Sequence, residues 1–405
     1  MFDSTLALLA EGYAWLPDRR RRRDGRPVTG RLLGKKVVAL HGPDAVRFFY
    51  DERHVVRRGA LPGPVLDTLF GRGAVHTLDG ARHRARKALF TALLQDRGGL
   101  DRLAADLADQ WTRARRRWDG LDRLVFFDEA GLLLTRAVCD WSGVPLPDDG
   151  AEGTARDLLA MVDGFASVGP RHLRARRARS RQEDRIARLV TEVRDGDRTA
   201  PEGSVLRAVA DHRDDDGRLL DPHTAAVEIL NVLRPTVAVA WFLTFAAHAL
   251  HRWPEHGKRL ADGDAAWARA FAQEVRRFYP FAPFAGGIAA ADLRWEGQDI
   301  PEGSMVLLDL YGQNHDPELW PEPYAFDPGR FLGREPGRDE LIPQGGGDPA
   351  VHHRCPGEDV VLTVLETLVP HLAELPYRVP EQDLRIPLNR VPTAPRSGFV
   401  MTPVP

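Results

Sequence analysis

The sequence of 405 residues is poor in cysteine, carries almost no net charge and has no long apolar run near its start. Cys139 and Cys355 are its two cysteines, which excludes a disulfide framework and indicates a reducing compartment, so a cytoplasmic protein is expected. The formal net charge of −2 gives no reason to expect a polyanionic partner. The opening residues, MFDSTLALLAEGYAWL, lack a basic segment and are too short for a membrane span.

Nucleotide-binding motifs are also missing. The chain has no P-loop, and GRGAVHTLDG lacks the third glycine of a dinucleotide fingerprint, so no flavin or nicotinamide domain is expected. Neither an internal repeat nor a long linker divides the chain, which predicts one domain over residues 1–405. Hydrophobic residues make up 43% and charged residues 28%, as in ordinary globular proteins.

The pattern that is present is mainly helical. Apolar residues recur at helical spacing over most of the chain, for example from Leu100 and from Arg181. Strand patterns are short and lie near the two ends, at residues 37–40, 305–310 and 397–405. The sequence therefore predicts a mainly α fold with small β-sheets.

Two arginine clusters stand out, one at residues 19–23 and one in RHLRARRARSRQ from Arg171. Both lack interleaved aromatic residues, so a solvated surface is favoured over a nucleic-acid site. No nucleic-acid partner is expected.

The segment EILNVLRPTVAVAWFLTFAAHAL, residues 228–250, predicts a helix through the core. Asp221 can cap its N-terminus with Pro222 at the first helical position. Residues 237–250 are apolar nearly all round but fall short of the roughly 20 residues that a membrane span needs. Pro235 has no N–H, so the helix is expected to kink or open at the carbonyl of Asn231.

Arg234 would place a positive charge inside this apolar helix. A buried, unpaired guanidinium costs several kcal/mol, so it requires an anion. An internal salt bridge to a carboxylate is the commoner solution, and a clamp for the carboxylate of a ligand is the alternative.

Cys355 lies between a glycine-rich loop and a long amphipathic segment, in LIPQGGGDPAVHHRCPGE. A cysteine at a helix N-terminus is favoured as thiolate and can bind a metal. An inert buried thiol and a zinc site with His352 and His353 are alternatives, although three such close ligands do not match the usual zinc spacings. Cys139 lies in an apolar helical pattern and is expected to be a packed core thiol.

The order of several elements resembles the cytochrome P450 family. Glu274-x-x-Arg277, then PYAFDPGRF, then a single cysteine before PGE carry this resemblance over most of the chain. It implies haem b between the kinked central helix and the cysteine loop, with the Cys355 thiolate as axial ligand. Within the family, the chain resembles the bacterial fatty-acid peroxygenases through ILNVLRPTVA, LFGRGAVHTLDGARHRARKALF and IPQGGGD with HRCPGE.

That resemblance implies a function. Arg234 and Pro235 stand where ordinary members carry an acid/alcohol pair, so hydrogen peroxide is the expected oxidant and no redox partner is required. Arg234 would hold the carboxylate of a fatty acid above the haem, giving hydroxylation at Cα or Cβ or decarboxylation to a terminal alkene. A redox-partner-dependent monooxygenase and a non-catalytic haem or fatty-acid carrier are the competing functions.

The resemblance also implies roles near the reacting centre. His76 occupies a position that holds glutamine or histidine in this branch, and it is expected to act beside the oxidant, with Arg234 and Pro235 as the other catalytic residues. Phe70 would pack against His76 and the substrate. Without the resemblance, His76 and Phe70 would be interpreted as core residues.

Four residues are expected to hold the haem propionates by the same resemblance: Arg57, His83, Lys87 and His353. A solvated charge is the competing interpretation for Arg57 and Lys87. Glu274, Arg277 and Arg330 are expected to form a structural ion-pair cluster, with Gly329 in place of the usual glutamate before Arg330.

Overall fold

The structure is a computed structural model that describes residues 3–404. Its α-helices are α1 Thr5–Glu11, α2 Trp15–Arg21, α3 Pro43–Tyr50, α4 Gly63–Val65, α5 Gly80–Leu94, α6 Arg97–Trp118, α7 Phe126–Ser142, α8 Ala151–Gly164, α9 Pro170–Asp195, α10 Val205–Asp211, α11 Pro222–Val237, α12 Val239–Arg252, α13 Gly257–Ala261, α14 Ala265–Phe278, α15 Leu310–Asn314 and α16 Glu358–Glu374. The strands are β1 Val28–Leu32, β2 Lys35–Leu40, β3 Val55–Val56, β4 Leu124–Val125, β5 Phe284–Ala289, β6 Leu293–Trp295, β7 Gln298–Ile300, β8 Met305–Asp309, β9 Tyr377–Arg378 and β10 Val400–Pro403.

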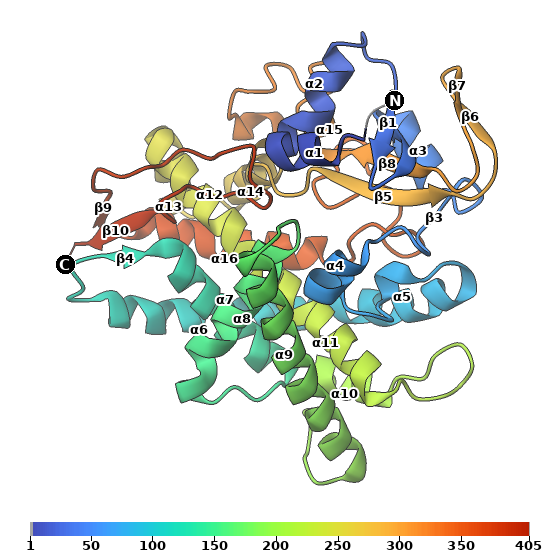
Figure 1. The fold of residues 1–405 in the computed structure, drawn as a ribbon. Helices are drawn as coiled ribbons and strands as arrows, with labels where there is room; N and C mark the ends of the chain where they lie inside the picture. The colour runs from blue at the N-terminus through green and yellow to red at the C-terminus, as the bar shows by residue number, and fades with distance from the viewer. Residues whose placement is uncertain (1–2, 405) are drawn as a thin grey trace.

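Short turns of other helix types connect these elements: η1 Gly12–Ala14, η2 Leu66–Phe70, η3 Val75–Thr77, η4 Asp148–Gly150, η5 Pro254–His256 and η6 Pro328–Phe331. Figure 1 shows helices forming most of the molecule, with the main sheet at the side that holds the N-terminus. The predicted mainly α fold with small β-sheets is confirmed.

The largest sheet joins segments that are far apart in the sequence. Its strand order is β1-β2-β8-β5-β3, and the parallel pair β2–β8 sets Val37 opposite Met305. A second sheet has the order β4-β10-β9, and β6 pairs with β7. The three predicted strands are present as β2, β8 and β10, although Pro405 lies outside the described residues.

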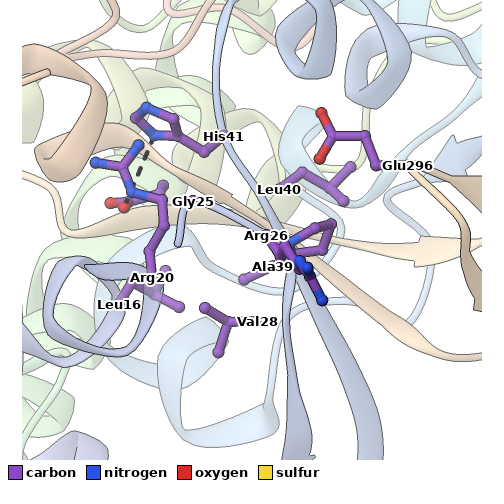
Figure 2. Close-up of a pocket in the computed structure, with 11 residues that line it drawn as sticks. Leu16, Arg20, Gly25, Arg26, Val28, Ala39, Leu40, His41 and Glu296 are labelled. Carbon is purple, nitrogen blue, oxygen red and sulfur yellow. Dashed lines mark ion pairs between the residues drawn. The ribbon is translucent and has the colours of Figure 1, made fainter. Parts of the chain in front are cut away.

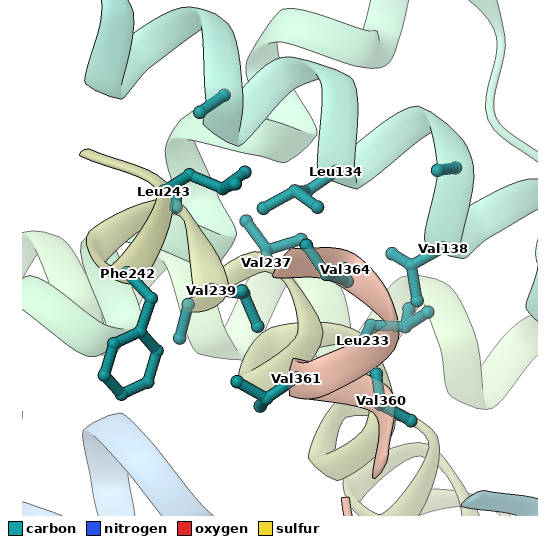
Figure 3. Packing of buried hydrophobic residues seen from close by; sticks show 14 of the residues in the cluster. Leu134, Val138, Leu233, Val237, Val239, Phe242, Leu243, Val360, Val361 and Val364 are labelled. Atoms are coloured by element: carbon teal, nitrogen blue, oxygen red, sulfur yellow. The ribbon is translucent and has the colours of Figure 1, made fainter. Parts of the chain in front are cut away.

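The central helices α11 and α12 lie in the core between α7 and α16. Figure 3 shows side chains from these four helices meeting in one cluster: Leu134 and Val138 from α7, Leu233 and Val237 from α11, Val239 from α12, and Val360 and Val364 from α16. With Ala238 between them, α11 and α12 span 31 residues and are together long and apolar enough to cross a membrane, which corrects the shorter span counted from the sequence. The apolar window is 94% buried inside the protein, as a core helix requires.

The start of α11 follows the prediction, whereas its interruption does not. The Asp221 carboxylate accepts the Thr224 N–H at 3.0 Å, and Pro222 is the first helical residue. The helix continues through Pro235 and is interrupted three residues later at Ala238, whose carbonyl accepts the Trp241 N–H at 3.1 Å. The helix is not broken at Asn231, and the turn that separates α11 from α12 follows the proline. The kink expected at Pro235 stays a prediction.

Candidate active site

The loop before α16 fixes the position of Cys355. Its N–H donates to the Gln344 carbonyl at 3.1 Å, and Gln344 Nε2 lies 3.7 Å from Cys355 Sγ. A side chain at Gly345 would meet Tyr50 Oη at 2.5 Å, and one at Gly346 would meet Val46 at 2.3 Å. The glycines are therefore required because the loop packs directly on α3.

Two opposing effects set the charge of the Cys355 thiol. Burial raises its pKa, while the Gly357 N–H at the start of α16 lowers it, as do Lys87 and Arg276. The sequence predicted the helix-terminus effect, but burial outweighs it in the protein alone. A metal cation at the sulfur would deprotonate this thiol outright, so the site fits a bound metal.

Arg234 is buried without a carboxylate partner in the part of the chain that the structure describes. Its Nη2 donates to Asn231 Oδ1 at 3.1 Å, while its Nε has no hydrogen-bond partner. Burial lowers its pKa to about 9, the cation of Arg179 adds to this effect, and Cys355 opposes it. Because no internal salt bridge forms, the commoner interpretation of this residue from sequence is excluded for residues 3–404.

His76 and Phe70 lie beside Arg234. Their ring centroids are 4.4 Å apart, and the Arg234 guanidinium is 5.7 Å from the Phe70 ring centroid. Burial holds the pKa of His76 well below its usual range, and Arg234 is the first of the cations that lower it further. His76 is therefore neutral at pH 7, and its Nδ1 has no hydrogen-bond partner among residues 3–404.

Sequence reasoning missed Glu228 and Asn231, two polar residues that connect these loops to α11. Glu228 Oε1 accepts the Val75 N–H at 2.8 Å, next to His76, and its other oxygen accepts from Asn231 Nδ2 at 3.1 Å. Asn231 Nδ2 also donates to the Phe70 carbonyl at 3.0 Å. The signal in the sequence was their spacing of three residues, which aligns them with Arg234 on one helix face.

Two arginines from distant segments hold Glu228 and the backbone before Phe70 in place. Arg86 Nη1 donates to Glu228 Oε1 at 2.8 Å and also pairs with Asp214. Arg179 Nη1 donates to the Leu69 carbonyl at 2.6 Å, just before Phe70. No local sequence pattern indicates these contacts, because each joins segments more than a hundred residues apart.

The four predicted propionate contacts come together near the cysteine loop. Arg57, His83 and Lys87 are buried, which excludes a solvated charge for Arg57 and Lys87. The rings of His83 and His353 stack with centroids 3.8 Å apart, and Lys87 donates to the Arg354 carbonyl. Within the described chain, Arg57 Nη1, His83 Nδ1 and His353 Nε2 have no hydrogen-bond partner.

This group suits an anion better than a metal cation. The ligand atoms of Glu52, His83 and His353 lie within 4.8 Å of one another, a spacing that could hold a metal. However, burial lowers the pKa of His83 to about 4, and Lys87, Arg57 and Arg84 lower it further while Asp79 opposes them, so cations outnumber anions among these neighbours. Buried donors in a positive field require anionic acceptors, and haem propionates would supply them.

The ion-pair cluster predicted around Glu274 forms despite Gly329. Arg277 donates to both carboxylate oxygens of Glu274 at 2.7 Å, and Arg330 Nε lies 3.3 Å from Glu274 Oε2. The Gly329 N–H donates to Asp327 Oδ1 at 2.8 Å, which holds the turn without a glutamate side chain. Cys139 is buried and its pKa is raised to about 12 by burial, as expected for a core thiol.

A hollow away from these residues is too small for a fatty acid. Figure 2 shows it beside β2, with Arg20, His41 and Leu40 among its lining residues. Its volume of about 10 Å³ accommodates a water molecule. None of the predicted site residues lines it.

Known proteins resemble this chain along its whole described length. The cytochrome P450 family model matches residues 267–371. A variant of cytochrome P450SP alpha (CYP152B1) superposes with a TM-score of 0.96 at 43% identity, covering 99% of this chain and 98% of that chain. Cytochrome P450EX alpha (CYP152N1) with myristic acid gives 0.94 at 38%, covering 99% and 97%. A variant of cytochrome P450 OleT in complex with arachidonic acid gives 0.96 at 36%, covering 99% and 96%.

A curated relative supports the broader family. Cyclooctat-9-en-7-ol 5-monooxygenase of Streptomyces melanosporofaciens is 30% identical over 308 residues. The alignment covers 66% of this chain and 65% of that enzyme, so it spans less than two thirds of the enzyme's length.

A half-buried cysteine, Cys355, before the long core helix α16, in a fold with these relatives, defines a haem-thiolate protein. The chain belongs to the cytochrome P450 superfamily, within the CYP152 peroxygenase branch. Its cofactor is haem, with a cysteine thiolate as ligand of the iron.

Proposed function

We propose that the protein is a hydrogen-peroxide-dependent enzyme that oxidises free fatty acids next to the carboxylate. Its products would be Cα- or Cβ-hydroxy acids, terminal alkenes, or both. Two relatives are described with myristic acid and arachidonic acid bound, which supports the substrate class. The proposal includes turnover without a redox partner and a cytoplasmic location.

The observation that carries the proposal is the unpaired charge of Arg234. It lies in an apolar helix. Among residues 3–404 its side chain makes one hydrogen bond, through Nη2 to Asn231, and its Nε has no partner. A fatty-acid carboxylate would supply the missing anion, and the apolar surroundings suit its alkyl chain. Neutral substrates would leave the guanidinium unpaired.

The residues for holding the cofactor are grouped around the cysteine loop. Cys355 would bind the iron, and Arg57, His83, Lys87 and His353 would bind the propionates. Among residues 3–404, Arg57 Nη1, His83 Nδ1 and His353 Nε2 have no hydrogen-bond partner, and Lys87 donates to a neutral carbonyl. When bound, haem supplies oxidising power from peroxide. The protein's contribution is to position the carboxylate and to exclude water.

The overall chemistry balances with peroxide alone. Hydroxylation converts R–H and H₂O₂ into R–OH and H₂O, and decarboxylation converts RCH₂CH₂COOH and H₂O₂ into RCH=CH₂, CO₂ and two H₂O. Fixing the carboxylate on Arg234 places Cα and Cβ near the reacting centre. The same carboxylate can accept a proton from one oxygen of hydrogen peroxide and return it to the other, in place of the acid/alcohol pair that Arg234 and Pro235 replace.

His76 is the second group that can move a proton. Burial and nearby cations lower the pKa of its imidazole, and its Nδ1 has no hydrogen-bond partner among residues 3–404. The unprotonated ring therefore has a nitrogen available for proton exchange next to the substrate. We propose that this residue influences the ratio of alkene to hydroxy acid.

The proposal is tested with haem-loaded protein, a saturated fatty acid and hydrogen peroxide, without a reductase. Gas chromatography with mass spectrometry should detect 2- or 3-hydroxy acid or a terminal alkene. Product that forms only with ferredoxin and its reductase would establish a redox-partner-dependent monooxygenase instead. A spectral shift on adding fatty acid with no product under either condition would indicate a carrier.

A further inference from the structure

Glu228 of α11 is a fully buried carboxylate that the proposed chemistry does not use. All of its hydrogen-bond partners within residues 3–404 are donors. Its Oε1 accepts the Val75 N–H at 2.8 Å and Arg86 Nη1 at 2.8 Å, and its Oε2 accepts Asn231 Nδ2 at 3.1 Å. Both oxygens are therefore acceptors, as an ionised carboxylate requires.

The side-chain amide of Asn231 has one favourable orientation between its neighbours. Its Nδ2 faces two acceptors, Glu228 Oε2 at 3.1 Å and the Phe70 carbonyl at 3.0 Å. Its Oδ1 faces a donor, Arg234 Nη2, at 3.1 Å. Turning the amide over would set its oxygen against two acceptors and its NH2 group against a cation. Glu228 therefore keeps the Asn231 oxygen on Arg234.

The loop that carries Phe70 and His76 is held through its backbone by the same group of residues. Side chains from α5, α9 and α11 contact four backbone groups of residues 69–75, and α9 packs against α11 (Figure 1). The contacts are Arg179 Nη1 to the Leu69 carbonyl at 2.6 Å, Asn231 Nδ2 to the Phe70 carbonyl at 3.0 Å, Arg86 Nη1 to the Gly73 carbonyl at 3.2 Å, and the Val75 N–H to Glu228 Oε1 at 2.8 Å. The positions of both rings thus depend on Glu228 and its partners.

Arg86 supplies the counter-ion for the buried Glu228. Its Nη1 lies 2.8 Å from Glu228 Oε1, and its other nitrogens pair with Asp214. Burial raises the pKa of Glu228, and Arg86 opposes this effect. Because Arg86 compensates this carboxylate, and Glu228 makes no ion pair with Arg234 within residues 3–404, the charge of Arg234 is left for a ligand.

We propose that Glu228 is a positioning residue for both halves of the active site. Through Asn231 it fixes the Nη2 end of the Arg234 guanidinium, and through the Val75 N–H it fixes the loop at residues 70–76. The substrate carboxylate and the rings beside it are then held relative to one buried group, so Glu228 helps to select the carbon atom that reacts. This role rests on the proposed function, because it concerns the placement of a fatty acid.

Glu228→Gln tests this role with almost no change in side-chain shape. The remaining oxygen can still accept from Val75 and Arg86, but the new NH2 group faces Asn231 Nδ2, which is also a donor. Asn231 then loses the contact that fixes its orientation, and Arg234 loses its fixed acceptor. Binding of a saturated fatty acid, measured by the spectral shift of the haem-loaded enzyme, should weaken about fivefold to tenfold, while binding of its methyl ester should be unchanged.

The direction of this change separates positioning from electrostatics. Glu228→Gln removes a negative charge, which by itself would strengthen the binding of an anionic substrate. General damage to the fold would weaken binding of the acid and of the ester alike. Weaker binding of the acid alone is therefore the signature of positioning, and unchanged or tighter binding of the acid would overturn the proposal.

Asn231→Leu is a second test, which also serves if Glu228→Gln folds poorly. It removes the acceptor of Arg234 directly and should weaken acid binding at least as much. Because Glu228 acts on Arg234 through Asn231, the double variant should bind the acid like Asn231→Leu alone. Additive losses in the double variant would contradict this route.

Glu274→Gln is the matched control. Glu274 is also a fully buried carboxylate paired with arginine, but its partners are Arg277 and Arg330 of the structural ion-pair cluster. The variant should be less stable, yet it should keep the preference of the enzyme for acid over ester. Equal loss of this preference in Glu274→Gln and Glu228→Gln would overturn the proposal.

Product analysis with hydrogen peroxide adds a readout of geometry. At equal haem content, Glu228→Gln should change the ratio of 2-hydroxy acid, 3-hydroxy acid and alkene by several-fold. An unaltered enzyme that prefers the acid but forms no product would refute the proposed function and leave the positioning of Arg234 standing. An enzyme that forms product, with the same acid preference in Glu228→Gln, would refute the positioning role alone.

Discussion

Arg277 and Arg234 are both buried arginines on core helices, but their surroundings differ. Arg277 is 0% exposed, pairs through two donors with Glu274, and donates to the carbonyls of Asn314, Pro323 and Ala325. Arg234 is 6% exposed and donates only to Asn231 among residues 3–404.

The difference separates a structural arginine from one that awaits a ligand. Burial of a guanidinium is tolerated when all its donors are paired, as for Arg277. Arg234 lacks that compensation, and burial lowers its pKa to about 9. The free-energy cost of burying the unpaired Arg234 guanidinium would be offset by an anionic ligand that binds to it.

The largest expected effect comes from Arg234→Leu. Loss of the carboxylate partner should reduce kcat/KM for a long-chain fatty acid by at least about a hundredfold. The haem spectrum and most of the folded stability should be retained, because the substitution leaves no buried carboxylate unpaired among residues 3–404 and removes only the hydrogen bond to Asn231. Arg234→Lys is the matched control. It keeps the positive charge but cannot form bidentate hydrogen bonds with a carboxylate, so it should retain more activity than Arg234→Leu and less than the unaltered enzyme.

In contrast to Arg234→Leu, Arg277→Leu should lower the stability of the fold. Removing this partner leaves the buried Glu274 carboxylate without its main counter-ion, which should lower the free energy of unfolding by about 3–5 kcal/mol. Denaturant unfolding measures the loss. The double variant Arg277→Leu with Glu274→Leu should be less destabilised than the single one, and equal destabilisation of the two would contradict the account.

Lys87 is another buried cation, and its lowered pKa makes the stability of the haem-free protein depend on pH. Burial lowers its pKa from 10.5 to about 8, although Cys355 is the first of the anions that raise it. In the haem-free protein the unfolded state therefore binds more protons between pH 8 and 10.5, so stability from this group rises with pH there and is lost as pH falls to 8.

A propionate beside Lys87 would restore its proton, so haem affinity should fall as pH rises above 8, by up to about tenfold per pH unit. Haem transfer to a competing acceptor protein measures this. Lys87→Arg stays charged and should remove the added slope between pH 8 and 10. An identical slope in both proteins would exclude Lys87 from the cofactor site.

The smallest effect is expected at His76. His76→Gln retains a polar side chain beside Phe70 but cannot relay a proton, so products should shift toward hydroxy acid by several-fold. Product ratios from gas chromatography measure the shift, with total turnover as the internal control. An unchanged ratio would show that another group decides the partition.

Local patterns in the sequence were sufficient for several features. The cap at Asp221, the three strands and the position of Cys355 each depend on neighbouring residues, and each is present as predicted. Arg234 was recognised because a charge stands out in an apolar helix. The family resemblance added the haem and is supported by solved structures at up to 43% identity.

Features that depend on distant contacts could not be predicted in this way. Glu228 is held by Arg86 and by the Val75 N–H, which come from segments more than a hundred residues away. The interruption at Ala238 lies three residues after Pro235, a position that the proline alone did not indicate.

The central claim is that Arg234 binds the carboxylate of the substrate, and a two-by-two binding experiment tests it most directly. Affinities of a saturated fatty acid and of its methyl ester are measured by the spectral shift of the haem, with the unaltered enzyme and with Arg234→Leu. The account predicts that the acid binds the unaltered enzyme at least about thirtyfold more tightly than the ester, and that this preference disappears in the variant. An equal preference for the acid in both proteins would contradict it.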